Sequence, residues 1–273
     1  MPHTSAIRQL FCQEICKPDT EMSLDRAALY VALEEYPALD VEAYLKMLDD
    51  MAASVEKQIP RNAPTYEVID AISDRLFHQL GYMGTTMHFS NPIAIHFNDV
   101  LDRRVGVPIT LSLVYLAIAR RVGLPMVGIG FPGHFLIRPE DPTFDGWVDP
   151  FYRGAILTRQ DCQFRLLEIF RQPVELKDEY LQPLPSRQVL ARLLTTLKMA
   201  YLNGGNPRKA LVATERILLL FPDRADEWRD RGMLNYQLNH FSEARQDFTR
   251  YLKLVPNPPE DASFIQGVLN TVQ

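Results

Sequence analysis

Residues 98–125 have the sequence NDVLDRRVGVPITLSLVYLAIARRVGLP, and the middle of this stretch decides the fold. Over residues 109–119 nearly every side chain is apolar, with Thr110 and Ser112 as the exceptions. A helix that is apolar on all faces is buried on all faces, so this helix is expected at the centre of a domain. Pro108 suits its first turn, where a missing N–H costs nothing and the fixed φ favours the helix.

Short strand-like runs follow this helix, at residues 126–130, 134–138 and 147–148. Pro-Gly and Pro-Glu-Asp-Pro sequences separate them, and such sequences are typical of turns. A buried helix followed by a small antiparallel sheet predicts an α+β domain. A later stretch, residues 178–186, carries two prolines among polar residues and is interpreted as a linker.

The chain before this core has the apolar periodicity of helices. Ser23 and Asp40 are expected to cap two of them, because both follow a break and precede apolar positions at helical spacing. A third helix is expected to begin at Thr65 and to stop at Gly81. These helices are interpreted as packing elements.

An internal repeat marks the C-terminal third. Ala210 and Ala244 are 34 positions apart, and so are Pro222 and Pro256. This is the period of the tetratricopeptide repeat, a helical hairpin in which small residues allow paired helices to approach closely. In the first repeat Lys198 stands where a small residue is expected. The second repeat resembles the family most closely, in Trp228, Gly232, Ala244, Phe248 and Pro256.

Two repeats bury little surface, so a closing helix is expected around residues 264–269. The resemblance also implies a concave surface on the inner helices, to which a partner peptide or helix would bind. The alternative is that this face only packs against residues 1–180. The side chains expected to line this repeat groove are Arg192, Thr195, Met199, Leu202, Asp226, Arg229, Met233 and Tyr236.

Four short motifs resemble the transglutaminase-like, papain-related core. They are Gly106-Val107-Pro108, RRVGLP at 120–125, Gly133-His134-Phe135 and Trp147-Val148-Asp149-Pro150. In that family a cysteine opens the buried helix, where the helix dipole lowers the pKa of its thiol, while histidine accepts the proton and aspartate orients the ring. His134 and Asp149 match that histidine and aspartate, whereas Pro108 stands where the cysteine is expected.

More narrowly, the central stretch together with GFPGHFLIR and VDPF resembles the bacterial SirB-type family, whose own pattern has proline at this position. The resemblance implies a transglutaminase-like domain at 1–180, with a helical front (1–90) and a core (91–180), followed by tetratricopeptide repeats at 187–273.

The preferred hypothesis is a non-catalytic, regulatory interaction protein in which His134 and Asp149 are a remnant pair. A second hypothesis is an enzyme that cleaves or transfers amide or ester bonds with Ser112 or Thr110 as nucleophile, which requires a hydroxyl about 3 Å from the His134 ring. The alternative interpretation is that these hydroxyls have a structural role, in which each donates a hydrogen bond to a backbone carbonyl one helical turn back. A third hypothesis for the function is a small-ligand receptor that uses the former substrate cleft.

The composition argues against several functional classes of protein. A net charge of −5 offers no basic field for nucleic acid. No apolar run approaches the ~20 residues that cross a bilayer, and no signal-type start is present, so the protein is expected to be cytoplasmic. Cys12, Cys16 and Cys162 are too few for a disulfide framework or a metal site, and no cofactor is expected.

Overall fold

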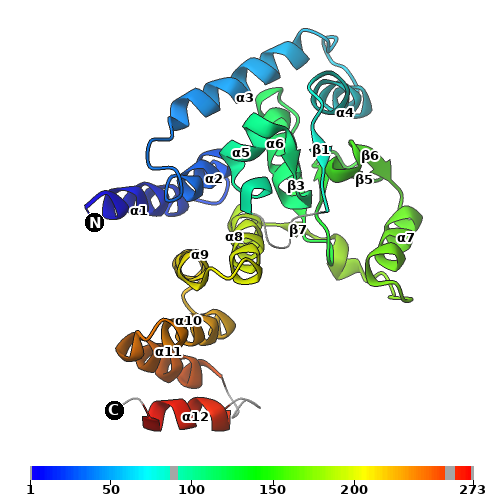
Figure 1. Cartoon of the computed structure of the whole chain (residues 1–273). Coiled ribbons are helices and arrows are strands. Elements are labelled where there is room, and N and C mark those ends of the chain that lie inside the picture. The colour runs from blue at the N-terminus through cyan, green and yellow to red at the C-terminus, as the bar shows by residue number, and fades with distance from the viewer. Residues whose placement is uncertain (1, 87–91, 256–261, 272–273) are drawn as a thin grey trace. The chain divides into compact units, whose positions relative to one another are not determined.

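The computed structural model describes residues 2–86, 92–255 and 262–271 (Figure 1). The α-helices are α1 (Pro2–Ile15), α2 (Leu24–Ala32), α3 (Val41–Glu56), α4 (Thr65–Ser73), α5 (Phe97–Arg103), α6 (Pro108–Arg121), α7 (Arg159–Phe170), α8 (Ser186–Asn203), α9 (Pro207–Leu220), α10 (Ala225–Gln237), α11 (Phe241–Leu254) and α12 (Ala262–Thr271). Short helical turns are η1 (Asp74–Gln79), η2 (Pro92–Ala94), η3 (Pro150–Tyr152) and η4 (Asp178–Leu181). The strands are β1 (Met83–Gly84), β2 (Val105–Gly106), β3 (Met126–Ile129), β4 (Leu136–Pro139), β5 (Trp147–Asp149), β6 (Ala155–Leu157) and β7 (Pro183–Leu184).

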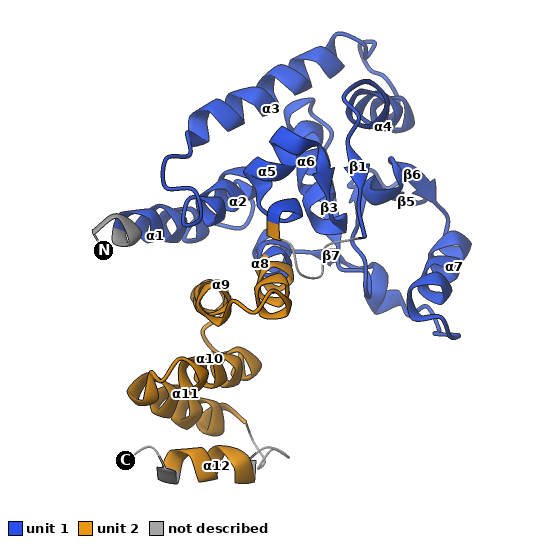
Figure 2. Ribbon diagram, viewed as in Figure 1, with its two compact units in different colours: residues 1–88, 93–193 blue, residues 89–92, 194–273 orange. Residues whose placement is uncertain are grey.

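The chain divides into two compact units, residues 1–88 with 93–193 and residues 89–92 with 194–273 (Figure 2). The division falls inside α8, whereas the sequence placed it before this helix. The start of α8 is fixed to the first unit by a side chain far away in sequence. Asp19 accepts the backbone N–H groups of Ser186 and Arg187 at 2.7 and 3.0 Å, which satisfies two donors at the helix N-terminus.

The three expected front helices are present. Asp40 caps α3, because its side chain accepts the N–H of Ala43 at 3.1 Å. Ser23 occupies the extended N-cap position of α2, but its side chain makes no capping hydrogen bond to this helix. The third helix, α4, continues into the π-helical turn η1 and stops at Gly81, whose φ of 75° favours glycine.

Helix α6 is the centre of the first unit, as predicted. Residues 109–119 are all buried, and the helix packs against α2, α3, α4 and α5 and against β3 and β4. The Tyr115 hydroxyl donates to the carbonyl of Ile69 at 2.8 Å, which ties α6 to α4. Every face of α6 is therefore covered, and this explains its unbroken apolar sequence.

The main sheet has five antiparallel strands in the order β6-β5-β4-β3-β7. The interpretation of residues 178–186 as a linker is wrong. They contain η4 and the strand β7, in which Leu184 lies opposite Gly128 of β3. Proline is compatible with this position because β7 is an edge strand. A second, two-stranded parallel sheet pairs β1 with β2.

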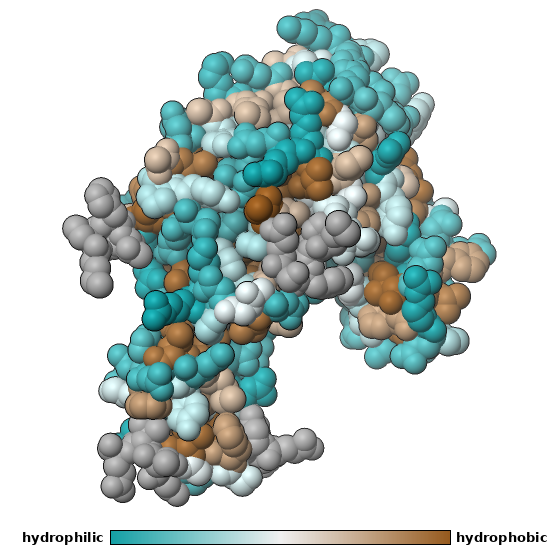
Figure 3. Space-filling view, viewed as in Figure 1, coloured by the Kyte–Doolittle hydropathy of each residue, from teal (hydrophilic) through white to brown (hydrophobic). Residues whose placement is uncertain are grey.

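Helix α7 was not predicted from the sequence. Cys162 and Leu166 on its inner face are buried in a core with sheet residues such as Trp147. Its outer face also carries apolar side chains among charged ones, since Phe164 and Leu167 are 55% and 43% exposed (Figure 3). Apolar residues on both faces remove the period that distinguishes an amphipathic helix, so the pattern gave no signal.

The second unit contains the two predicted helical hairpins. A Cβ atom at Gly232 of α10 would lie 2.7 Å from ring carbons of Phe248 on α11, so a small residue is required there. The closing helix is α12, and its Ile265 and Val268 are buried against α11. Pro256, the terminal proline of the second repeat, lies outside the described residues.

Candidate functional site

His134 and Asp149 are in contact, although fifteen positions separate them. His134 Nε2 lies 2.9 Å from Oδ1 and 3.0 Å from Oδ2 of Asp149. His134 sits in the turn before β4 rather than in the strand, after Gly133 with its φ of 69°, and Asp149 ends β5. Both side chains are buried. The sequence thus predicted the pair but not the turn that presents it.

The Asp149 carboxylate binds more than the histidine. It accepts the backbone N–H groups of Phe151 and Tyr152 at 3.1 and 3.3 Å and thereby caps η3. Its other oxygen lies 3.5 Å from the Arg165 guanidinium of α7. A buried carboxylate with these donors is compensated for the loss of water. Asp149 therefore links β5, η3 and α7 as well as orienting His134.

Arg165 belongs to this site and was missed from the sequence. Its guanidinium carbon lies 3.7 Å from the ring centroid of Tyr152, a cation–π contact, and the group also donates to Glu168 at 2.7 Å. Only the unpredicted α7 brings this arginine beside Asp149. No motif marks it, because its partners come from two other elements.

Aromatic rings surround His134. The Phe151 ring meets it edge-on at 5.6 Å, and the Tyr152 ring lies at 6.0 Å. Phe151 also packs against the backbone of Gly84, where a Cβ atom would lie 2.7 Å from two ring carbons. Gly84 pairs with Gly106, two residues before α6. Phe151 is thus in contact with both the histidine and the strand pair that leads to the expected nucleophile position.

The first turn of α6 holds no nucleophile. Pro108 is the first helical residue. Thr110 Oγ1 accepts the N–H of Val107 at 3.0 Å and lies 3.1 Å from the carbonyl oxygens of Ala94 and Val107. Ser112 is fully buried, and its Oγ has no hydrogen-bond partner within the described ranges. Neither hydroxyl bonds to His134, so the structure does not bring the two candidate nucleophiles to the pair.

The cysteines do not replace the missing thiol. Cys162 on α7 is fully buried, and its burial, with the nearby charges of Asp161 and Asp149, raises its pKa to about 12. At neutral pH this thiol is protonated and inert. Cys12 lies on α1, and the exposed Cys16 directly follows this helix. In the part of the chain that the structure describes, no cluster of His, Cys, Asp or Glu could hold a metal ion, and no helix is long and apolar enough to span a membrane.

The residues expected in the repeat groove are divided between the two units. Arg192 lies in the first unit, where its guanidinium contacts the carbonyl oxygen of His134 at 3.5 Å. Burial lowers its pKa. Arg192 thus lies in the same unit as His134, and its place in a repeat groove stays a prediction. The seven remaining residues are Thr195, Met199, Leu202, Asp226, Arg229, Met233 and Tyr236, and all lie on α8 or α10 of the second unit.

Apolar side chains are exposed at equivalent positions of these two helices. Met199 of the first repeat and Met233 of the second are 34 residues apart and are 47% and 40% exposed. Leu202, one turn further along α8, is 38% exposed. A methionine in each repeat is typical of surfaces that adapt to a partner.

Lys198 explains why the first repeat departs from the pattern. Its Nζ lies 2.9 and 2.8 Å from the two carboxylate oxygens of Glu227 and 2.9 Å from Asp230. Lys198 and Glu227 are both buried. The site at which the family has a small residue is here occupied by an ion pair that joins α8 to α10.

Comparison with known families agrees with both units. Residues 42–195 match the transglutaminase-like superfamily, and residues 197–270 match the tetratricopeptide repeat. The fold class expected from the sequence is thereby confirmed. The combination defines a transglutaminase-like domain followed by helical repeats.

Relatives that match most of this chain identify its family more closely. A UPF0162 protein of Xylella fastidiosa (strain 9a5c) is 34% identical over 88% of this chain and 86% of its own. The UPF0162 protein of Pseudomonas aeruginosa is 31% identical over 90% and 89%. The chain therefore belongs to the transglutaminase-like superfamily and, within it, to the UPF0162 proteins. A segment covering 36% of the chain is also 38% identical to 17% of human F-box only protein 21.

Proposed function

We propose that this protein is a non-catalytic interaction protein, in which the transglutaminase-like unit is a scaffold and the repeats bind a partner polypeptide. One observation carries the proposal. No thiol or hydroxyl among the described residues bonds to His134, and the helix that should present the nucleophile begins with Pro108. Acyl transfer by this fold needs a nucleophile in contact with its base.

A structural role accounts for the pair without catalysis. Asp149 caps η3 and binds Arg165, and His134 fills the space between this carboxylate and Phe151. The alternative, a hydrolase or acyltransferase with Ser112 or Thr110, is less well supported. Ser112 is inaccessible to substrate, and Thr110 serves as a helix cap.

The repeat surface supports the binding role. Met199 and Met233 offer apolar area at equivalent positions, and Tyr236 adds an aromatic ring. Apolar anchors of this type dominate the energetics of peptide recognition. The shared order of a transglutaminase-like domain and repeats supports the finer SirB-type assignment, which stays a prediction, as does the cytoplasmic location.

Two variants of the full chain test the proposal. In the double variant Met199→Lys/Met233→Lys, two charges replace the exposed methionines, while Leu219→Lys makes the same type of change at a 40%-exposed position on α9. After matched melting curves have been confirmed, each protein is used to capture partners from the native cell and the products are identified by mass spectrometry. A protein retained by the wild type and by Leu219→Lys, but lost by the double variant, is expected.

Reaction with a fluorophosphonate probe tests the enzymatic alternative. We expect no adduct on Ser112 or Thr110 after peptide mapping, because neither hydroxyl contacts a base. An adduct that forms on the wild type and disappears in His134→Gln would show an active nucleophile and overturn the proposal.

A further inference from the structure

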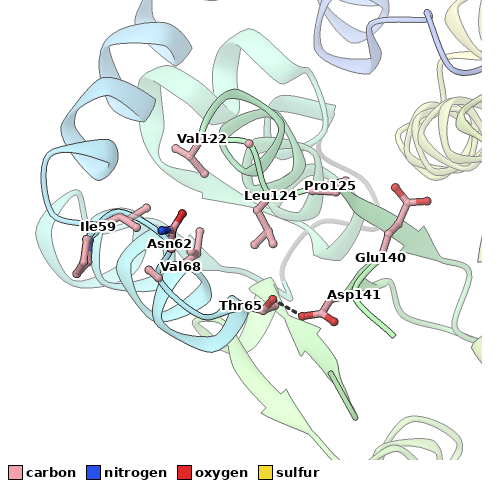
Figure 4. Close-up of a pocket in the computed structure, with 12 residues that line it drawn as sticks. Ile59, Asn62, Thr65, Val68, Val122, Leu124, Pro125, Glu140 and Asp141 are labelled. Carbon is pink, nitrogen blue, oxygen red and sulfur yellow. Dashed lines mark hydrogen bonds between the residues drawn. The ribbon is translucent and has the colours of Figure 1, made fainter. Parts of the chain in front are cut away.

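A cavity of about 490 Å³ lies at the surface of the first unit (Figure 4), and Glu140 and Asp141, which directly follow β4, line it. Three loops converge on it: the connection between α3 and α4, the turn between α6 and β3, and the loop that follows β4. His134 precedes β4 and Glu140 follows it, which at ~3.3 Å per residue separates the two by roughly 20 Å. The cavity is therefore distinct from the histidine site.

The floor of the cavity is apolar and its charged rim is acidic. Leu124 and Val68 point into it in Figure 4, with Ile59 and Val122 beside them. The charged lining residues are Glu140 and Asp141, and no Lys, Arg or His side chain lines the cavity within the described chain. Apolar walls with a few placed polar groups are characteristic of binding sites, and this volume is in their usual range.

Asp141 is held in place and stays ionised. Thr65 Oγ1 donates to one of its oxygens, and Thr143 donates its N–H at 2.9 Å and its hydroxyl at 2.7 Å to the other. These bonds lower the pKa of Asp141. They also tie the loop after β4 to the start of α4, so two walls of the cavity are fixed relative to each other before any ligand arrives.

Glu140 has a fixed backbone and an unengaged carboxylate. Its N–H donates to the carbonyl of Pro125 at 2.9 Å, but its exposed side chain makes no hydrogen bond or ion pair to any described residue. In Figure 4 it lies beside Pro125, while Asp141 points toward Thr65. A cation bound between the two residues would contact the fixed carboxylate of Asp141 and the unpaired carboxylate of Glu140.

A second hollow is adjacent to this cavity. Pro125 and Glu140 line this hollow of about 590 Å³, whose apolar residues include Leu116 and Met126. The charged residues that line this second hollow are Asp19, Asp25, Arg120 and Glu140. The first cavity differs in that its charged lining residues are both acidic, so it is the one suited to a basic group.

We propose that this cavity binds a segment of a partner polypeptide in which an apolar side chain packs on Leu124 and Val68 and a neighbouring lysine or arginine reaches Glu140 and Asp141. The stem of such a basic side chain covers apolar surface while its charged end stays at the rim. The volume exceeds that of one side chain, which is why two adjacent residues are assigned. The site is separate from the repeat surface and holds whether or not the repeats bind a partner.

The test uses a display library of random dodecapeptides selected on the immobilised full-length protein. We expect the enriched peptides to share a basic residue next to an apolar one. For a selected synthetic peptide, fluorescence anisotropy should show about a two- to fivefold loss of affinity in Glu140→Gln, the effect of one exposed charge pair. Glu175→Gln, at another exposed carboxylate of the same unit, is the control and should bind like the wild type.

The outcomes separate this site from the repeat surface. If Met199→Lys/Met233→Lys loses the selected peptides while Glu140→Gln keeps them, the peptides bind the repeats and the cavity proposal is wrong. Selection without enrichment of basic residues also overturns it. If Glu140→Gln weakens binding and the double methionine variant does not, the cavity site stands whatever the fate of the proposed repeat partner.

Discussion

Replacing Lys198 by methionine should destabilise the second unit by about 3 kcal/mol. The lysine neutralises Glu227, whose side chain is only 3% exposed, and it also bonds to the 34%-exposed Asp230. Removing one member of a buried ion pair leaves an uncompensated charge, which costs about 3–5 kcal/mol. The lower end applies because Asp230 reaches solvent and because the Arg224 guanidinium stays 4.0 Å from the Glu227 carboxylate.

The same change should make stability more sensitive to pH. Burial raises the pKa of Glu227, and the charge of Lys198 opposes that rise. An acid with a raised pKa in the fold contributes stability that is present at low pH and is lost as pH rises through that pKa. Without Lys198, burial raises the pKa of Glu227 further. The variant should therefore recover part of its lost stability between pH 7.5 and pH 5, and the gap to the wild type should narrow.

Tryptophan fluorescence can follow the second unit alone. The chain has two tryptophans, Trp147 in the first unit and Trp228 in the second, so a Trp147→Phe background reports only on the repeats. Urea titrations at both pH values give the free energy of unfolding. Lys253→Met, at an exposed lysine of α11, is the control and should change it by less than about 0.5 kcal/mol.

A rescue variant completes the test. Adding Glu227→Gln to Lys198→Met removes the stranded charge and should restore at least half of the lost free energy. A cost below about 1 kcal/mol for Lys198→Met, or a cost that is equal at pH 5 and pH 7.5, would refute the reasoning, since a buried unpaired carboxylate must produce both effects.

Three further predictions concern the core of each unit. Asp149→Asn should lower the free energy of unfolding of the first unit by about 2–4 kcal/mol, seen in urea titrations, because the contact with Arg165 loses its charge. Ser112→Ala should be neutral or stabilising by up to about 1 kcal/mol in the same assay, because a buried hydroxyl without a partner is removed; a loss of more than 1 kcal/mol would reveal a hidden partner. Gly232→Ala should cost about 1–2 kcal/mol by thermal melting, since the new methyl group would lie 2.7 Å from Phe248, and a stabilised variant would mean that the helices can separate freely.

The sequence predicted structural elements correctly wherever the period of the apolar residues and the composition indicated the same element. The apolar run of α6 and the spacing of the repeats predicted elements that the structure contains, because each follows from a local pattern. It failed where tertiary packing sets the outcome. Strand β7 was hidden by Pro183, which is tolerated because the strand lies at an edge of the sheet. Lys198 violated the repeat pattern, and its partner Glu227 is 29 residues away.

The residues of the candidate site were likewise predictable only in part. Motif spacing identified His134 and Asp149, but Arg165 comes from a helix without an amphipathic period, so no local signal marked it. This third member changes the interpretation of the pair. In a catalytic arrangement the aspartate only has to orient the histidine, whereas here the same carboxylate also caps η3 and anchors α7.

A histidine–aspartate pair can therefore be required for a fold without serving catalysis. Asp149 is fully buried and takes donors from the histidine, from two backbone N–H groups and from Arg165, so removing the histidine takes away one of several donors. If the pair is structural, His134→Gln should keep the fold because an amide can still donate to the carboxylate, whereas Asp149→Ala should lose it. An enzyme would differ in reactivity, because His134→Gln would keep the fold yet abolish labelling of the nucleophile by the fluorophosphonate probe. Measuring both melting and probe labelling on the same two variants separates these cases.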